Sequence, residues 1–373
     1  MKYWRGYLVA AILAACTWGF REFASTHSKL VDMIYPYVTR LVQNFMAGWS
    51  SGVAFCLWQA ILLALIAVGV ATIVLMIIFK WNPIQWFGWI LAAASLVLLL
   101  HTGIFGMNEY AGPIAEDIRL IETECSDEQL EAAAVYYRDK ANALSSQVGA
   151  LELSVLNEEA VEGFDTLVYD HYYSVFAGSN VPVKTLDMEN WFTKRGEMGY
   201  TVPITGEAAI NPETPSFMQP YAVCREMCYR KCIASDRDKH FGAFLACQAN
   251  DAVEFQYASC VMAYRYCLMA LPQSVAGEVN AKANAQLRED LDAWDAFVAP
   301  AEVLAAEKAE KEGLKDTTDR EIAELIVRWH YQEVVLPSIT EPEVQFDPMD
   351  ETQVDLTGLP HAPVPTEPTE EAA

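Results

Sequence analysis

Long uncharged runs near the N-terminus dominate the hydrophobic pattern of this chain. Val53–Phe79 contains no charged residue, and Trp86–Leu100 is a second apolar run that can be extended through Phe105. A helix needs about 20 apolar residues to cross a bilayer core, so both runs predict membrane spans. Tyr7–Phe20 is a shorter run of the same kind. The pattern therefore predicts a membrane domain over residues 1–103, with spans at about 4–20, 53–79 and 85–104.

The first apolar run also has a second interpretation. It follows Lys2 and Arg5, as the core of a signal peptide does, and Leu13-Ala14-Ala15-Cys16 resembles a lipoprotein cleavage site. Cleavage there would leave a lipid on Cys16. Because four residues of this kind often occur together in apolar runs, we expect an uncleaved first span.

After residue 104 the pattern becomes mostly helical, with apolar residues three and four positions apart. Residues 177–220 are richer in Gly, Pro, Thr and Asn, which predicts loops and short strands. Ser235 followed by Asp238 predicts a capping box at the start of a helix. The predicted fold is mainly α, with a helical domain over 104–336. Its helices are predicted at 127–151, 165–176, 220–233, 236–248, 253–271, 280–298 and 319–335.

The last part of the chain, residues 337–373, differs in composition from the rest. It is rich in proline and acidic residues and contains no lysine or arginine. Such a segment buries too little apolar surface to offset the entropy lost on ordering. We expect a disordered acidic tail.

The formal charge of the chain is −25, and it is unevenly distributed. Residues 1–103 carry more basic than acidic side chains, whereas the remainder is strongly acidic. Binding of phosphates needs clustered lysine and arginine, so the balance excludes nucleic acid as a partner. The lipid bilayer is the partner that the predicted spans imply.

Basic residues beside the spans predict the orientation in the membrane. Lys2 and Arg5 flank the first span, and Lys80 lies in the turn between the second and third. Such residues favour the cytoplasmic side, which places everything after about residue 104 outside the cytoplasm. The segment 21–52 is then an external loop. It carries Arg21, Lys29 and Arg40, which act against this orientation.

Several of the nine cysteines have helical spacing. Cys224, Cys228 and Cys232 are four residues apart and form one stripe on a helix, and Cys260 and Cys267 form a similar stripe. Buried thiols, disulfides between the stripes and a thiolate metal site are all compatible with this spacing. Ordinary buried thiols are the favoured interpretation.

Several stretches of the chain carry a family pattern. They are Thr205–Asn211, Pro220–Tyr229 and Phe241–Asn250, together with Phe105–Pro113 after the third span. These stretches resemble the bacterial membrane-anchored, zincin-like domain-of-unknown-function family thirty-eight-ten. Its members resemble this chain in plan, with three N-terminal spans and a helical domain outside the cytoplasm. The resemblance therefore implies a zincin-like domain at the bacterial plasma membrane, facing the cell envelope.

The resemblance also implies a lost metal site. The family's central helix reads His-Glu-x-x-His, in which the histidines bind zinc and the glutamate activates the zinc-bound water. Here the histidine positions are Arg225 and Tyr229, and only Glu226 is kept. Asp236 or Asp238 occupies the region of the third ligand, and Asp236 is favoured because Asp238 already has a capping role. Arginine offers no lone pair to a metal, so we expect no cofactor and no zinc hydrolysis.

The sequence leaves two positions open for the side chain of Arg225. Its guanidinium either stands where the metal would stand, neutralised by Asp236 or Asp238 with Tyr229 hydrogen-bonding nearby, or it points to solvent. The remnant pocket is expected around Glu226 and Glu207. A relocated metal site is the weaker alternative, and its candidate ligands are Cys224, Cys228 and His240.

Three functions fit these observations. The first is an inactive, membrane-anchored relative of metallopeptidases that binds an envelope protein or peptide. The second is an active membrane zinc metallopeptidase with a rearranged ligand set. The third is a purely structural membrane subunit. Metal content separates the second from the other two, and the depth of the pocket separates the first from the third.

Overall fold

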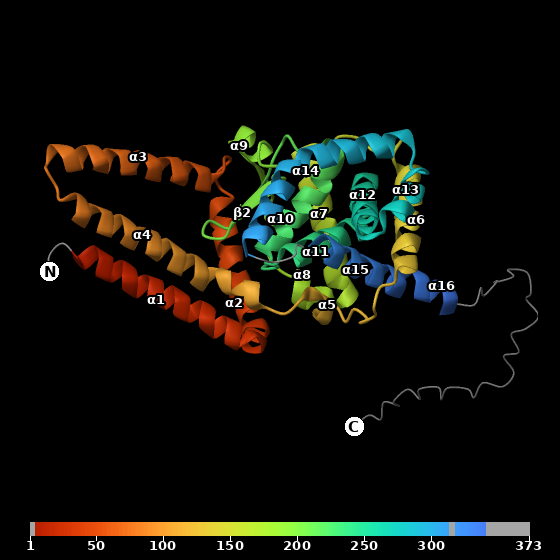
Figure 1. Ribbon diagram of the computed structural model, residues 1–373, viewed down its shortest axis with the longest axis horizontal. Helices are drawn as coiled ribbons and strands as arrows, with labels where there is room; N and C mark the ends of the chain where they lie inside the picture. The colour runs from red at the N-terminus through yellow and green to blue at the C-terminus, as the bar shows by residue number, and fades with distance from the viewer. Residues whose placement is uncertain (1–3, 313–317, 341–373) are drawn as a thin grey trace, which may run out of the picture.

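The computed structural model describes residues 4–312 and 318–340, and Figure 1 shows three long helices that project from a helical domain. These helices are α1 (Arg5–Thr26), α3 (Leu57–Ile78) and α4 (Pro83–Ile104), and each is long and apolar enough to cross a membrane. The predicted fold class, mainly α with three N-terminal candidate spans, is confirmed. The first residues of the predicted disordered tail, 337–340, instead belong to the helix α16 (Leu336–Thr340), and the rest of the tail, from 341 onward, lies outside the described residues.

The three candidate spans are not packed equally. α1 lies along α4, and the two backbones approach closely where glycine meets glycine: a Cβ atom added to Gly6 would lie 2.5 Å from the carbonyl carbon of Gly88. Small residues allow such close contact between membrane helices. In Figure 1, α3 diverges from this pair towards the domain. Gln59 is its buried residue, so most of α3 is available to lipid.

The segment 21–52, which connects the first two predicted spans, is almost entirely helical. α1 continues to Thr26, and α2 (Ser28–Ser50) follows after a single residue. The buried positions of α2 recur every three to five residues and form a stripe against the domain: Val31, Pro36, Thr39, Gln43, Ala47 and Ser50. Arg40 donates hydrogen bonds to the carbonyl oxygens of Ser174 and Lys231, at 2.5 and 3.0 Å. This basic side chain therefore serves packing within the fold.

The domain after α4 is built around three buried helices. They are α10 (Gln219–Arg230), α11 (Asp236–Gln248) and α12 (Val253–Ala270), and most of their residues are inaccessible to solvent. α12 is mostly apolar, whereas α10 and α11 also carry charged side chains, among them Arg225, Glu226 and Asp236. The surrounding helices are α5 (Ile114–Asp117), α6 (Asp127–Leu144), α7 (Leu153–Leu167), α8 (Tyr173–Phe176), α9 (Glu189–Thr193), α13 (Gln273–Asn280), α14 (Ala285–Glu312), α15 (Thr318–His330) and α16 (Leu336–Thr340).

Helix boundaries follow local chemistry at some ends only. α11 begins at Asp236 as predicted, because the hydroxyl of Ser235 accepts a hydrogen bond from the backbone N–H of Asp238 at 3.0 Å. The reciprocal half of the predicted capping box is missing, since the carboxylate of Asp238 pairs with Arg237 instead. α14 runs through Pro300, beyond the predicted end at residue 298.

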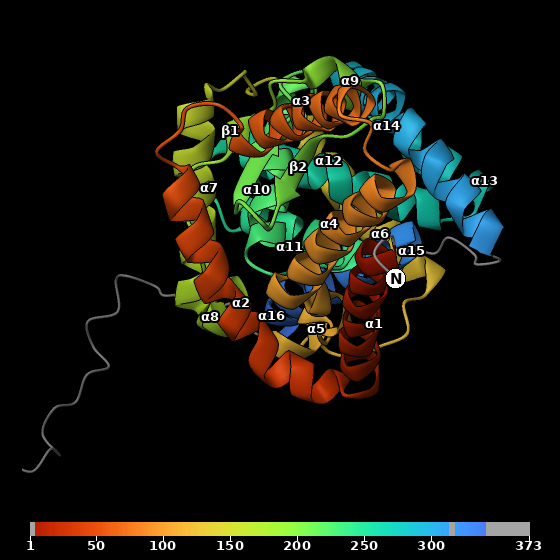
Figure 2. The same ribbon diagram turned by 90° about the vertical axis from the view of Figure 1, so that its left-hand side faces the viewer.

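The predicted short strands form a small sheet within residues 177–220. β1 (Lys184–Thr185), β3 (Glu207–Ile210) and β2 (Gly199–Val202) lie in that order, with β1 parallel and β2 antiparallel to β3. Gly206, in the turn between β2 and β3, has a φ of +67° and presses against α2. A side chain there would be strained and would collide with the backbone of Ala47. Figure 2 shows the sheet and α10 on the side of the domain that faces the long helices.

The cysteine stripes lie inside the domain. Cys224, Cys228, Cys260 and Cys267 are fully buried in its apolar core, and all nine cysteines of the chain are free thiols. Cys232 lies two residues after the end of α10. Its sulfur accepts a hydrogen bond from the hydroxyl of Thr39 in α2. The stripes therefore contribute to packing, as the favoured interpretation expected.

Candidate functional site

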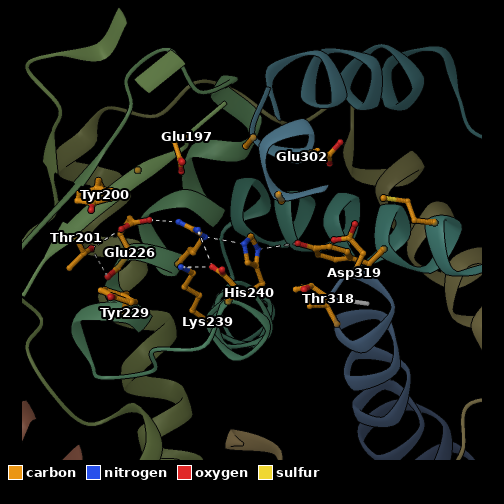
Figure 3. Close-up of a pocket in the computed structure, with 18 of the residues that line it drawn as sticks. Glu197, Tyr200, Thr201, Glu226, Tyr229, Lys239, His240, Glu302, Thr318 and Asp319 are labelled. Atoms are coloured by element: carbon orange, nitrogen blue, oxygen red, sulfur yellow. Dashed lines mark hydrogen bonds and ion pairs between the residues drawn. The ribbon is translucent and has the colours of Figure 1, made fainter. Parts of the chain in front are cut away.

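A polar cavity of about 650 Å³ lies where β2, α10 and α11 meet α14 and α15 (Figure 3). β2 and Glu197 just before it form one side, α10 and α11 form the base, and α14 with the start of α15 forms the opposite side. Phe105, which follows α4, packs against Tyr229 of this cavity, with 4.6 Å between ring centroids and an angle of 40° between the rings. The cavity therefore borders the end of a candidate membrane span.

Arg225 occupies the base of the cavity and does not extend into solvent. Its Nη1 lies 2.5 Å from Oε1 of Glu226, and its Nε donates to Nε2 of His240 at 3.0 Å. Nη2 lies 3.8 Å from a carboxylate oxygen of Asp236. Burial alone would lower the pKa of Arg225, but Glu226 and Asp236 outweigh it and raise that pKa. The guanidinium is therefore a fixed positive charge held by three side chains.

Glu226 uses both of its carboxylate oxygens in this network. Oε1 pairs with Arg225, and Oε2 accepts a hydrogen bond from the hydroxyl of Thr201 at 2.6 Å. β2 approaches closely at Gly199, where an added Cβ would lie 2.7 Å from Cγ of Glu226. Glycine at this position lets the strand cover the carboxylate, and Glu226 is only 2 % exposed.

His240 is neutral and locked in one orientation. A guanidinium can only donate, so Nε2 of His240 must accept from Arg225, which leaves the ring proton on Nδ1. Nδ1 lies 3.1 Å from the hydroxyl of Tyr221 and 3.0 Å from that of Tyr266. Burial, and next the charge of Arg225, lower the pKa of His240 well below its usual value. No charge on His240 repels Arg225.

Asp236 and Lys239 form a second ion pair at the rim, with 2.6 Å between Nζ and Oδ1. Lys239 also lies over the ring of Tyr229, 5.1 Å from its centroid. Burial opposes the charge on Asp236, but Lys239 and Arg225 outweigh it and lower the pKa of this carboxyl. Tyr229 contacts Lys239 and Phe105 through its ring, in place of the predicted hydrogen bond. Burial raises the pKa of its hydroxyl.

The cavity as a whole is acidic. Five carboxylates line it, against two cationic side chains. The carboxylates are those of Glu197, Glu226, Asp236, Glu302 and Asp319, and the cations are Arg225 and Lys239. Glu302 pairs with Arg265 behind the cavity, at 2.6 Å. Glu197 has no ion-pair partner among the described residues, and burial raises its pKa.

The structure brings most predicted site residues together. Arg225, Glu226, Tyr229, Asp236 and His240 all line the cavity. Arg225 is held by the nearer carboxylate of Glu226 and only at longer range by the predicted Asp236.

Four other predicted residues, Glu207, Asp238, Cys224 and Cys228, lie elsewhere. Asp238 faces a second cavity beside α2, where it accepts a hydrogen bond from the N–H of Ile114. Cys224 and Cys228 are in the apolar core, away from His240 in the cavity. In the described part of the chain, no three His, Cys, Asp or Glu side chains are grouped so that they could hold a metal ion.

Glu207 lies outside the cavity and binds the start of α3. Its two carboxylate oxygens accept hydrogen bonds from the backbone N–H groups of Leu57 and Trp58, both at 2.9 Å. Nζ of Lys184 lies 2.6 Å from the same carboxylate. Asp187 accepts from the N–H of Cys56 in a similar way, at 2.9 Å. A carboxylate at a helix N-terminus satisfies free N–H groups and complements the helix dipole.

Sequence reasoning missed Glu197, Thr201 and Lys239. Lys239 sits beside His240 and three residues after Asp236, so its helical spacing was a usable signal. Glu197 and Thr201 come from the segment predicted only as loops and short strands. Nothing in their local sequence indicates that β2 passes over α10.

Comparison with known families assigns this architecture. The family described as Protein of unknown function (DUF3810) matches residues 31–312. The chain belongs to this family. The match begins in α2 and ends with α14, so it includes α3, α4 and every cavity residue before α15. It confirms the family resemblance seen in the sequence. No curated protein and no solved structure shows significant similarity to this chain.

Proposed function

We propose that this protein is a membrane-anchored binding protein, built on a zincin-like domain whose zinc site has been replaced by an internal ion network. The observation that carries this proposal is the position of Arg225, held between Glu226 and His240 at the base of the cavity. A cation of fixed charge at this point repels a metal ion and offers it no lone pair. The residues present do not fit zinc.

The remaining groups also do not fit hydrolysis. A general base must be free to take a proton from water, but both oxygens of Glu226 are held, one by Arg225 and one by Thr201. Tyr229 is a neutral phenol packed between Phe105 and Lys239. Binding without chemistry is what this arrangement supports.

The charge of the cavity supports a cationic ligand. Arg225 and Lys239 are already paired with carboxylates, whereas Glu197 is not. Met269 and Ile322 add apolar surface to the lining. A basic segment of an envelope protein or peptide would bring an ammonium group to Glu197 and methylene groups to the apolar side.

The orientation that we propose places the domain outside the cytoplasm of a bacterial cell. Arg5 begins α1, and Lys80 lies in the turn between α3 and α4. Figure 1 shows the start of α1 and this turn at the same end of the long helices, away from the domain. Basic residues gathered at one end favour the cytoplasmic side. Reporter fusions after residues 80 and 340 test this: an external reporter should be active only at 340.

Metal content tests the loss of the zinc site. Full-length protein in detergent is loaded with zinc, desalted and analysed by mass spectrometry of the metal. We expect zinc well below one ion per chain. Near-stoichiometric zinc that is lost in Cys224→Ser or His240→Ala would overturn the proposal in favour of a rearranged metallopeptidase.

Binding of a lysine-rich fluorescent peptide separates a binding protein from a purely structural subunit. We expect saturable binding that weakens about tenfold in Glu197→Gln, since hydrogen bonds to charged groups contribute about 1.5–3 kcal/mol. Glu189→Gln on α9, outside the cavity, serves as the matched control. Binding that ignores Glu197→Gln, or no binding, would favour the structural subunit.

A further inference from the structure

A third cavity, of about 480 Å³, adjoins the acidic one at the start of α3. It is a groove between the first turns of α3, the helix α9 and the strand β2. Its lining is mostly aromatic and apolar: Trp58, Leu62, Met188, Trp191, Phe192, Arg195, Glu197 and Tyr200. Glu197 and Tyr200 line both cavities, so the two are adjacent.

The aromatic rings of Trp58, Phe192 and Tyr200 lie close together in this groove, beside the start of α3. The ring of Trp58 lies 5.6 Å from that of Tyr200 and 6.1 Å from that of Phe192. Trp191 remains 54 % exposed and Tyr200 48 % exposed. Exposed aromatic residues at the end of an apolar span are typical of the bilayer interface. The groove therefore opens at the surface of the bilayer.

The groove also continues into the bilayer along α3. Leu62, one turn after Trp58, is 41 % exposed, and the residues that follow it on α3 are apolar. An acyl chain that lies along this helix would run from the hydrocarbon core directly to the aromatic rings of the groove. A soluble ligand has no need of such a path.

Two opposite charges line the groove beside its aromatic rings. The guanidinium carbon of Arg195 lies 4.9 Å from the centre of the Trp191 ring, and Glu197 follows two residues later. Neither side chain forms an ion pair within residues 4–312 and 318–340. A ligand with an anion and a cation a few ångströms apart would satisfy both groups.

We propose that this groove holds one phospholipid whose headgroup carries a primary ammonium, as phosphatidylethanolamine does. Its acyl chain lies along Leu62 and Trp58, its phosphate binds Arg195, and its ammonium binds Glu197. This proposal does not depend on the loss of the zinc site, and the lipid would compete with a basic peptide for Glu197, which both would bind.

The chemistry of the headgroup predicts an order of preference. A primary ammonium donates up to three hydrogen bonds, so it can bind the carboxylate of Glu197 directly. The trimethylated ammonium of phosphatidylcholine has no N–H group and must bind more weakly. Phosphatidylglycerol lacks the cation altogether and leaves Glu197 unpaired beside an anionic lipid. The order should be ethanolamine, then choline, then glycerol.

Lipid retention by the full-length protein tests the proposal. The protein is equilibrated in detergent with each of the three phospholipids, all with the same acyl chains, and the bound lipid is counted by native mass spectrometry. We expect phosphatidylethanolamine to be retained about tenfold more than phosphatidylcholine. Arg195→Gln should reduce retention of both lipids, and Glu197→Gln should remove the preference between them. Lys194→Gln and Glu189→Gln, in and beside α9, are the matched controls.

Equal retention of the three lipids, or retention that ignores Arg195→Gln, would overturn the proposal. Lipids with brominated acyl chains give a second readout, because bromine quenches nearby tryptophan fluorescence. Quenching should fall in Trp191→Phe, and unchanged quenching would place the lipid elsewhere. Because peptide binding does not require Arg195, failure here is distinguishable from failure of the proposed function.

Discussion

Arg225 and Glu226 are consecutive residues of α10, yet Nη1 of the first lies 2.5 Å from Oε1 of the second. Consecutive positions project about 100° apart on a helix, so the long arginine side chain must bend over its neighbour to reach the carboxylate. Thr201 of β2 and His240 of α11 hold the pair from two other elements. The charged groups at the base of the cavity are therefore bonded to one another and to neighbouring side chains.

The first prediction is that two substitutions create a zinc site. Arg225→His combined with Tyr229→His places two imidazoles one turn apart around Glu226 and removes the fixed cation. Asp236 lines the same cavity, and its carboxylate would be the third ligand beside the two imidazoles. We expect zinc to rise from well below stoichiometry to about one ion per chain, measured by metal analysis after desalting.

The single variant Tyr229→His is the control for that experiment, since Arg225 remains in place. It should bind no more zinc than the natural protein. If the double variant folds and also stays metal-free, the geometry of α10 differs from that of a zinc-binding helix.

The second prediction concerns Lys231, which is 1 % exposed. Its Nζ donates to Oδ1 of Asn180 at 2.7 Å and lies 4.7 Å from the centre of the Phe164 ring. Burial, and next the charge of Arg230, lower its pKa to about 7. Lys231→Met should stabilise the domain by about 2 kcal/mol at pH 6, or about 4–8 °C in melting temperature.

The sign of the pH effect follows from proton binding. Between pH 7 and pH 10 the unfolded chain keeps the proton on Lys231 while the folded chain has lost it, so stability rises with pH. The gain from Lys231→Met should therefore shrink from pH 6 to pH 9. Thermal unfolding at both pH values measures it, and the exposed Lys194→Met is the control. An equal gain at both pH values would contradict this account.

The third prediction is that Glu207→Ala releases the start of α3. The substitution leaves Lys184 and the N–H groups of Leu57 and Trp58 without their partner, at a cost of about 3–5 kcal/mol for a buried ion pair. Cys56, the residue before α3, is fully buried in the intact structure.

Maleimide labelling of Cys56, read by peptide mass spectrometry in a Cys16→Ser background, reports this release. Labelling should increase at least tenfold in Glu207→Ala and stay low in Glu213→Ala, which alters an exposed side chain nearby. Equal labelling of the two variants would show that Glu207 does not hold the helix.

The fourth prediction tests the contact between α1 and α4. Gly6→Val should destabilise the pair, because the new Cβ would lie 2.5 Å from the backbone of Gly88 and overpacking costs about 1–3 kcal/mol. Gly19→Val on the same helix meets no atom within 4 Å and is the control. Thermal unfolding in detergent should show a lower midpoint only for Gly6→Val.

Much of this fold is readable from local pattern. Val53–Phe79 contains α3 because no charge interrupts it, and α11 begins at Asp236 because Ser235 caps it. The site is only partly readable. Arg225, Glu226 and Asp236 lie on two consecutive helices, so their meeting follows from short-range spacing.

The failures share a physical cause, which is dependence on distant partners. α2 has charges and Pro36, so no helix is predicted there, although its stripe of buried positions is visible at helical spacing. Glu207 looked like a pocket residue, but its partners are N–H groups about 150 positions earlier in the chain. No local pattern indicates such an attachment.

Through that attachment, the small sheet connects the start of α3 to the base of the cavity. β3 holds the first turn of α3 through Glu207, and β3 shares backbone hydrogen bonds with β2 from Val202 to Gly199. β2 in turn covers Glu226 at the base of the cavity. We therefore expect a tilt of α3 imposed by a thicker or thinner bilayer to reach the cavity as strain. Membrane thickness would then be one of the variables that set how tightly the cavity holds the ligand proposed above.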